Sequence, residues 1–443
     1  MRESLTGAPG PCTVPRNLSV SPLGCRFTNP QIQVKIMTSN PGSLPLSGVV
    51  VLDLSQIMAG PVCTMTLADM GADVIKVEKL NGGDDSRRMG PPFIKGWSAG
   101  FLAVNRNKRS LALDLRHEDG KKLFLRLVDR ADVLVENFRP GAMERLGLDH
   151  ATLVERRPSL VYCSISGFGA TGPYRSRGGF DLVAQGMSGL MSITGHPGSP
   201  PAKVGVPITD ISAGLMAANG ILCAYIHALK TGQGQFVDTS IMEAGLAYTI
   251  WESAVFFASG EIPGPLGSAH RMSAPYQAIR TSDGYINLAA PTQPTWEALC
   301  RALEREDLLT DSRFVTPADR KIREVELAML LEEIISQRST GHWLEFLEKA
   351  GVVAGPINDM KSVYNDPQVH ARDMMVDLED PELGTLHNIG IPVKLSATPG
   401  RIRHRAPGLG EHSRQILLEA GLSEEEVERL VADGVVGTSG TAG

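Results

Sequence analysis

The sequence predicts an α/β protein: a doubly wound, mostly parallel, Rossmann-like sheet forms a large domain, and a smaller α+β domain accompanies it. Two observations lead to this prediction. From residue 46 to about residue 240, β-branched and apolar runs alternate with helical patterns. After a glycine- and proline-rich linker at residues 260–273, that alternation gives way to hairpin signals and amphipathic helices.

The predicted domain boundaries follow changes in composition. Residues 1–45 are rich in Pro, Ser and Gly, and we expect a disordered N-terminal extension there. The rest divides into the first part of a large domain (46–260), a small domain (261–372), a segment that returns to the large domain (373–435) and a tail (436–443).

Six strands are expected in the large domain, at residues 49–54, 73–78, 110–115, 132–136, 160–165 and 235–239. Helices are expected from Ala59 to Met70, over 118–130, from Asp210 to Lys230, and from Ser240, a capping residue, to about Ser259. Parallel sheets bind ligands beyond the carboxyl ends of their strands. We therefore expect the ligand among the segments that follow these ends, residues 55–61, 79–88, 137–145 and 166–181.

The small domain is predicted from a hairpin and three helices. The hairpin joins residues 276–281 and 285–289 through Ser-Asp-Gly, and the helices cover 296–303, 325–337 and 342–349. A second hairpin (374–378 with 385–391), an extended stretch (392–395) and two short helices (415–420 and 424–432) follow.

Composition limits the class of protein. The 443 residues carry a net charge of -6 with both signs mixed, so no nucleic-acid or membrane surface is expected. Six scattered cysteines favour reduced thiols and a cytoplasmic location. A mitochondrial location is the alternative, because the basic N-terminal extension has some features of a transit peptide. No histidine spacing indicates a metal site.

A glycine motif at residues 167–172 imitates a dinucleotide fingerprint. Gly-Phe-Gly-Ala-Thr-Gly follows a predicted strand, but Pro173 and a polar stretch come next instead of a helix. The motif therefore favours a loop that brings backbone close to another kind of ligand.

Asp210 precedes a long, nearly uncharged helical run, whose apolar spacing predicts a buried helix. Two interpretations of this residue remain open. In the first, Asp210 occupies a cap position and only satisfies the helix terminus. In the second, the carboxylate is a rigidly held nucleophile, and unpaired backbone N–H groups near it could bind an oxyanion.

Several ordered motifs resemble those of the family III CoA-transferases, from about Leu46 to Val431. They are Val-Leu-Asp-Leu-Ser-Gln-Ile-Met-Ala-Gly-Pro (51–61), Gly-Ala-Asp-Val-Ile-Lys-Val-Glu (71–78), Asn-Arg-Asn-Lys-Arg (105–109), Val-Glu-Asn-Phe-Arg-Pro-Gly (135–141), Ser-Ile-Ser-Gly-Phe-Gly (164–169) with Thr-Gly-Pro (171–173), and Lys-Thr-Gly-Gln-Gly (230–234). This family includes formyl-CoA transferase and glutarate-type transferases, and α-methylacyl-CoA racemase shares its fold.

The resemblance implies that Asp210 is the catalytic aspartate of a CoA-transferase of class EC 2.8.3. CoA would move from an acyl-CoA donor, such as succinyl-CoA, to a carboxylic and preferably dicarboxylic acid. The route would pass through an aspartyl–acyl anhydride and an aspartyl-CoA thioester. CoA thioesters would be substrates, with no permanently bound cofactor, and the chain would form an interlocked homodimer.

The resemblance also implies roles for individual residues. The CoA site would be lined by Gln56, Ile57 and Ala59, and its adenine and phosphates held by Lys79, Asn137, Phe138 and Arg145. Substrate contacts would come from Asp181, and from His270 or Arg271 at the far carboxylate of a dicarboxylic acid. Equally, His270 and Arg271 could be surface residues of a linker.

Two alternatives to a transferase remain. A racemase needs a His/Asp acid–base pair, and here the histidine position holds Phe180, beside Asp181. A non-catalytic CoA-binding protein is the other alternative, which the intact motif around Asp210 argues against. Met58 stands where formyl-CoA transferase has a glutamine, and this argues against that narrow activity.

Overall fold

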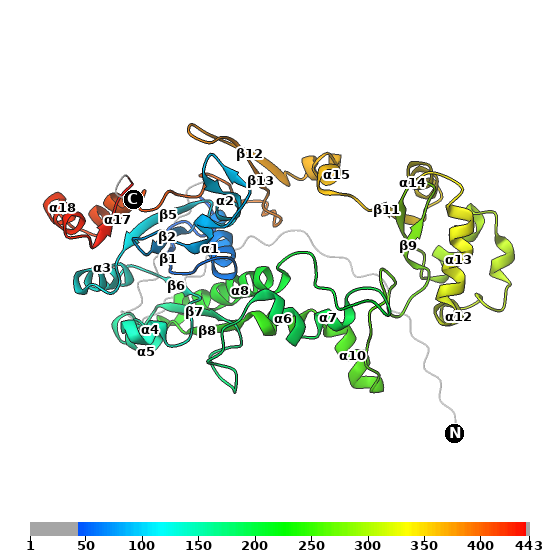
Figure 1. The fold of residues 1–443 in the computed structure, drawn as a ribbon, viewed down its shortest axis with the longest axis horizontal. Coiled ribbons are helices and arrows are strands. Elements are labelled where there is room, and N and C mark those ends of the chain that lie inside the picture. The colour runs from blue at the N-terminus through cyan, green and yellow to red at the C-terminus, as the bar shows by residue number, and fades with distance from the viewer. Residues whose placement is uncertain (1–42, 440–443) are drawn as a thin grey trace, which may run out of the picture. The chain divides into compact units, whose positions relative to one another are not determined.

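The computed structural model describes residues 43–439, so most of the predicted disordered extension and the last four residues of the tail lie outside the described residues. The central sheet has seven strands in the order β14-β5-β2-β1-β6-β7-β8 (Figure 1). All neighbouring strands are parallel except β14 and β5. The predicted α/β fold with a mostly parallel sheet is therefore confirmed.

The six predicted strands all form, within two residues of their expected ends. They are β1 (Val50–Asp53), β2 (Asp73–Glu78), β5 (Lys108–Leu113), β6 (Val133–Glu136), β7 (Val161–Ser166) and β8 (Phe236–Ser240). The seventh, β14 (Val436–Gly437), lies in the stretch expected to be a tail, and it pairs antiparallel with β5. Two residues carry no periodic pattern, so only the tertiary pairing defines this strand.

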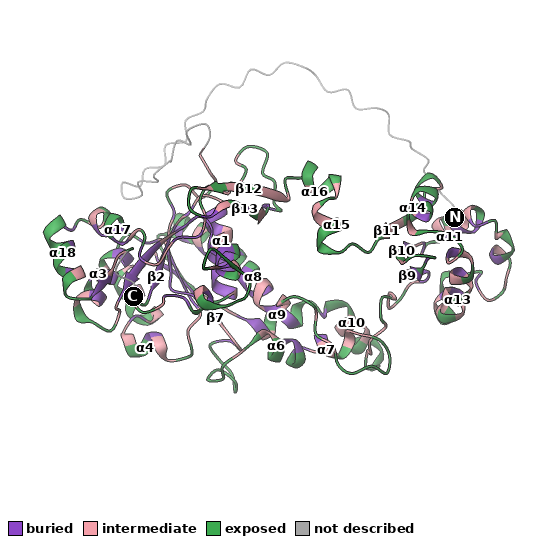
Figure 2. Ribbon diagram, turned by 45° about the horizontal axis from the view of Figure 1, so that its top comes forward, coloured by how far each residue is buried: buried purple, intermediate pink, exposed green. Residues whose placement is uncertain are grey.

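Helices cover both faces of the sheet. One core joins Leu52 and Ile75 to residues of α3 (Glu118–Val128), α4 (Ala142–Leu146), α5 (His150–Arg156), α17 (Ser413–Glu419) and α18 (Glu424–Ala432). The other joins Val51 and Val74 to α1 (Ala59–Asp69) and α8 (Ile208–Thr231). Neighbouring residues of one strand thus enter opposite cores, and the central strands β1, β2 and β6 are almost wholly buried (Figure 2).

The prediction that α8 is buried all round is wrong. Its small residues face the core, and a Cβ at Gly214 would meet the carbonyl oxygen of Ala59 on α1 at 2.5 Å. Close helix contact therefore selects glycine and alanine for the inner face. The large apolar residues point outward: Leu215, Met216, Leu222, Ile226 and Leu229 are 37% to 65% exposed. By length and composition α8 is the one described helix that could cross a membrane, yet its inner face packs on α1 and the sheet.

The helix predicted from Ser240 to Ser259 is broken into α9 (Ile241–Ala247) and α10 (Ile250–Ser259). Ser240 caps α9 as expected, through a hydrogen bond from the Glu243 N–H at 3.1 Å. The hydroxyl of Thr249 bonds the carbonyl oxygen of Leu246 at 2.9 Å, which competes with continued helical bonding at the break. No residue of α10 is buried.

A second sheet has the order β11-β10-β9, formed by β9 (Tyr276–Arg280), β10 (Tyr285–Ala289) and β11 (Val353–Pro356). The predicted hairpin between β9 and β10 is confirmed, whereas β11 was missed because its Ala and Gly residues lack a strand pattern. The three predicted helices form as α11 (Gln293–Ala302), α13 (Glu324–Ile335) and α14 (Thr340–Lys349), with a core of their own. The division into domains stays a prediction.

The remaining elements are short. The second predicted hairpin forms as β12 (Met375–Asp380) and β13 (Gly384–Ile389), and residues 392–395, expected to be extended, belong to no helix or sheet. The others are η1 (Asp85–Arg88), β3 (Phe93–Ile94), β4 (Trp97–Ser98), α2 (Ala99–Val104), α6 (Asp181–Met187), α7 (Leu190–Ile193), η2 (Glu306–Leu309), α12 (Pro317–Ile322), α15 (Met360–Tyr364) and α16 (Pro367–Ala371).

Candidate active site

A cleft of about 500 Å³ opens at the carboxyl ends of the central strands. After β1 the chain adds β2 and β5 on one side of the sheet and then β6, β7 and β8 on the other side. The direction in which strands are added therefore reverses between β1 and β6. Parallel sheets bind ligands at such a switch point. The cleft is lined by the loops after β1, β6 and β7 and by Asp210. Asp85, in the segment after β2, lines it as well, so all four segments expected to hold the ligand converge with the candidate nucleophile.

Asp210 is the third residue of α8, and the expectation that it occupies the cap position is wrong. Pro207 is the N-cap residue, and it offers no side-chain acceptor. Among the described residues the Asp210 carboxylate has no hydrogen-bond partner, although it is partly buried. Burial, and to a smaller degree the charge of Asp181, raises its pKa to about 6. A carboxylate with no hydrogen bond and a raised pKa has the properties of a nucleophile rather than a cap.

Asp181 begins α6 and reaches across to the start of α8. Its carboxylate accepts hydrogen bonds from the N–H and the hydroxyl of Thr209, at 3.0 and 2.8 Å, and from the Gln185 amide at 2.8 Å. Asp181 therefore accepts from a backbone N–H group at the start of α8, a helix other than its own, whereas a local cap would serve only α6. The hydrogen bonds to Thr209 hold α6 against α8, and the Asp181 carboxylate places a negative charge near Asp210.

The start of α1 offers unpaired backbone donors to the cleft. Met58 and Ala59 line it, and their N–H groups meet no acceptor among the described residues. α1 has no side-chain cap, so these groups remain available to a ligand. An oxyanion formed beside Asp210 would find donors here.

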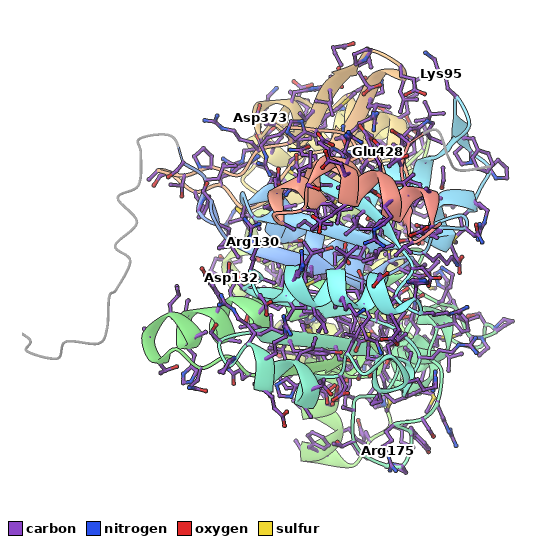
Figure 3. The ribbon with its side chains drawn as sticks, turned by 90° about the vertical axis from the view of Figure 1, so that its left-hand side faces the viewer. Lys95, Arg130, Asp132, Arg175, Asp373 and Glu428 are labelled. Carbon is purple, nitrogen blue, oxygen red and sulfur yellow. The ribbon has the colours of Figure 1, made fainter. Side chains whose placement is uncertain are left out.

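The glycine motif after β7 forms a loop and opens no helix, as predicted. The next helix begins only at Asp181. Gly167 and Gly179 pack so closely that a Cβ on Gly167 would lie 2.8 Å from the Gly179 backbone. Both line the cleft, while Arg175 is exposed on the same loop (Figure 3).

A second cavity, of about 380 Å³, adjoins the cleft through shared lining by Gln56 and Phe138. It contains two exposed cations, Lys79 and Arg116, at the ends of β2 and β5. Lys79 forms a 2.7 Å ion pair with Asp85. Arg116 was missed from the sequence, although it directly follows a predicted strand, as Lys79 does.

The structure brings together most of the predicted site residues. Asp210, Gln56, Ile57, Ala59, Asn137 and Phe138 line the cleft. Arg145 lies on α4 and lines neither cavity. Arg271 lies 3.6 Å from Glu252 and donates to the Gly264 carbonyl at 2.6 Å, while the His270 ring packs on Tyr276. Neither of these two residues lines the cleft within the described chain.

Among residues 43–439, no group of three or more His, Cys, Asp or Glu side chains could hold a metal ion.

Comparison with known proteins identifies a family. The model of CoA-transferase family III matches residues 46–413. The chain is 39% identical over 391 residues to a succinate–glutarate CoA-transferase of Agrobacterium fabrum, across 87% of this chain and 97% of that protein. It is 37% identical over 393 residues to the succinyl-CoA:glutarate CoA-transferase of Homo sapiens, across 88% and 90%.

A solved structure, that of a CAIB/BAIF family protein from Brucella suis, shares the fold. The TM-score is 0.77 at 41% identity, and the match covers 85% of this chain and 100% of that one.

Proposed function

The chain belongs to CoA-transferase family III, and we propose that it moves CoA from succinyl-CoA to a second dicarboxylic acid with Asp210 as nucleophile. The observation that carries this proposal is the Asp210 carboxylate in a cleft at the switch point of the sheet, with no hydrogen-bond partner in the part of the chain that the structure describes. The names of the relatives support succinate and glutarate as the class of acid.

The proposed reaction begins when an Asp210 oxygen attacks the thioester carbonyl. The C–S bond breaks, the electron pair leaves on the CoA thiolate, and an aspartyl–acyl anhydride remains. The thiolate then attacks the aspartyl carbonyl, releases the donor acid and forms an aspartyl-CoA thioester. The acceptor acid reverses both steps and leaves as acyl-CoA, with Asp210 regenerated. Covalent capture divides one exchange into steps between acyl groups of similar energy.

Each attack creates an oxyanion, and the unpaired N–H groups of Met58 and Ala59 are placed to bind it. Loss of one such donor typically costs about 10² to 10³ in rate. The adjoining cavity suits the other end of CoA, because Lys79 and Arg116 can bind phosphate. A molecule as long as CoA would then span both cavities past Gln56 and Phe138.

The function is tested with a panel of acids. The protein is incubated with succinyl-CoA and C2 to C6 mono- and dicarboxylic acids, and acyl-CoA products are identified by mass. New dicarboxylyl-CoA together with free succinate supports the proposal. Turnover of a chiral 2-methylacyl-CoA without any acid would indicate a racemase, and CoA binding without turnover would indicate a binding protein.

Lys79→Ala and Arg116→Ala should each raise the KM for acyl-CoA about tenfold, the loss of roughly one charged contact. The KM for the acceptor acid should stay within about twofold, because the acid carries no adenosine phosphate. Steady-state kinetics with both substrates varied measures this. Arg130→Ala, away from both cavities, is the control, and an unchanged acyl-CoA KM in both variants would contradict the assignment.

The rate should rise with pH through an apparent pKa near 6, because only ionised Asp210 attacks. Asp181→Asn removes a neighbouring negative charge, so this limb should move to lower pH. Burial is the larger cause of the raised pKa, so the shift should stay below about one unit. A pH–rate profile of both proteins measures it, and an upward shift would disprove the electrostatic link.

His270 and Arg271 remain proposed contacts for the far carboxylate of the acceptor. Arg271→Ala should raise the KM for a dicarboxylic acid about tenfold and leave that for acyl-CoA unchanged. Lys230→Ala, at the exposed end of α8, provides the control. An unchanged acid KM in Arg271→Ala would assign the residue to the linker alone.

We also propose a homodimer of interlocked chains. The outer face of α8 is apolar, and α10 exposes Trp251 and Phe257 at 54% and 80%. Large exposed apolar surfaces of this kind mark contacts between proteins. Light scattering at falling concentration tests it: interlocked chains keep the dimer mass on dilution, whereas a monomer mass contradicts the proposal. A cytoplasmic location is likewise a proposal, tested by fractionation against a mitochondrial one.

A further inference from the structure

Successive residues of the loop between β1 and α1 are held by side chains from β2, from the segment after β2 and from the loop after β6. Lys76 donates from Nζ to the Ser55 carbonyl oxygen at 2.8 Å. The side-chain amide of Asn137 bonds both the N–H and the C=O of Gln56, each at 2.8 Å. Asn137 thus contacts the loop backbone, and its role in the cleft begins with the shape of this loop.

Ile57, the next residue, has a φ of 68°. This left-handed conformation is strained for a β-branched side chain, so surrounding contacts must hold it. Its N–H donates to both carboxylate oxygens of Asp84, at 3.1 and 3.3 Å. A charged acceptor bonds an N–H more strongly than a neutral one, and this bond favours the strained peptide orientation.

Asp84 is itself buried and held by several contacts. It is 1% exposed and forms a 2.9 Å ion pair with Lys76, whose side chain is fully buried. Its own N–H donates to Glu78 at 3.0 Å, and its carboxylate accepts from the N–H and hydroxyl of Ser86. Asp84 lines neither the cleft nor the adjoining cavity, so it acts on a ligand through the residues that it holds, and Ile57 is the cleft residue that it contacts directly.

Met58 and Ala59 follow Ile57 directly; both line the cleft, and their N–H groups have no acceptor among the described residues. We propose that Asp84 is a positioning residue for CoA transfer: it holds Ile57 in the left-handed conformation and thereby directs the Met58 and Ala59 N–H groups at the thioester oxygen. This inference rests on the proposed function of the cleft. A displacement of these donors would weaken oxyanion binding without removing any group that touches CoA.

The test combines Asp84→Ala with Ile57→Gly. Alone, Asp84→Ala should lower kcat about 10- to 100-fold and change the acyl-CoA KM less than about threefold. Asp84→Asn keeps an acceptor oxygen, so its kcat should fall less than that of Asp84→Ala. In the Ile57→Gly background, Asp84→Ala should lower kcat by less than about threefold, because glycine adopts a positive φ without strain.

Urea unfolding of the same variants separates positioning from stability. Asp84→Ala removes an ion pair of Lys76 in both backgrounds, so both should be destabilised equally, while kcat recovers only with Ile57→Gly. An equal loss of kcat in both backgrounds, or no loss in either, would overturn the inference. If Asp84→Ala does not fold, Asp84→Asn is compared in the two backgrounds by the same criterion. If the wild-type protein transfers no CoA, both the proposed function and this inference fail. If it transfers CoA but the effect of Asp84→Ala on kcat does not depend on residue 57, only this inference fails.

Discussion

Asp210→Asn is expected to lower kcat for CoA transfer by about 10³-fold or more, because an amide cannot form the acyl anhydride. The same change should not harm the fold. Asp210 has a pKa raised from 3.8 to about 6, so the native state binds more protons than the unfolded chain between these values. Stability contributed by this group therefore falls as pH rises from about 4 to 6, and the loss persists above.

The neutral amide escapes that loss. Asp210→Asn should melt at or above the wild-type temperature at pH 8, and the difference should vanish near pH 4. Thermal unfolding at the two pH values measures this difference. The transfer rate and hydroxylamine trapping of an acyl group on residue 210 are measured in parallel, and they test the covalent mechanism.

Asp210→Glu is the matched variant, because it keeps the carboxylate and displaces it by one methylene; its rate should lie between those of the wild type and Asp210→Asn. Asp129→Asn, in an exposed ion pair with Arg156, should transfer CoA at the wild-type rate. Full activity of Asp210→Asn would refute the mechanism.

Asp53→Ala is expected to lower the free energy of unfolding by about 3–5 kcal/mol, the cost of leaving buried charges without a partner. Asp53 is fully buried beneath the loop after β1. Its carboxylate lies 3.0 Å from Lys108 Nζ and accepts a hydrogen bond from Thr64 at 2.7 Å. These partners hold the pKa of Asp53 well below its usual range despite burial, so it is charged at neutral pH.

Asp129→Ala is the control for this second effect. Its exposed pair with Arg156 should contribute no more than about 1 kcal/mol. The double variant Asp53→Asn/Lys108→Met should lose less than the sum of its single variants, since neither buried charge is then left alone. Urea unfolding measures all of them, and a cost for Asp53→Ala no greater than that for Asp129→Ala would mean that water or a rearrangement compensates Lys108.

The secondary structure that sequence patterns specify strongly was predictable. Strand β2 forms at the predicted residues, and the hairpin of β9 and β10 pairs as expected, because turn residues and periodicity act locally. Prediction failed for elements that no local sequence pattern specifies. β11 and β14 exist only through their partners, and the inner face of α8 was misassigned because large apolar residues suggested burial that small residues provide.

The candidate site was predictable where its residues follow strand ends. Gln56 and Asn137 lie in segments expected after strand ends, where a parallel sheet gathers its loops, and Arg116 follows the same rule. The family resemblance supplied the individual residues, and Asp210 was singled out by its place before a long apolar helix. Asp84 could not be predicted, because its role depends on a contact across 27 positions and on the backbone angle of Ile57.

By itself the sequence determined an α/β protein, the family motifs and an aspartate ahead of a long apolar helix. Only the tertiary structure decided the surroundings of that aspartate. It moved Asp210 from the cap to the third helical position, left its carboxylate without a hydrogen bond to any of residues 43–439 and set the charge of Asp181 near it. The reason is physical: periodicity and turn residues act over a few positions, whereas burial, charge pairing and strain arise where distant segments meet.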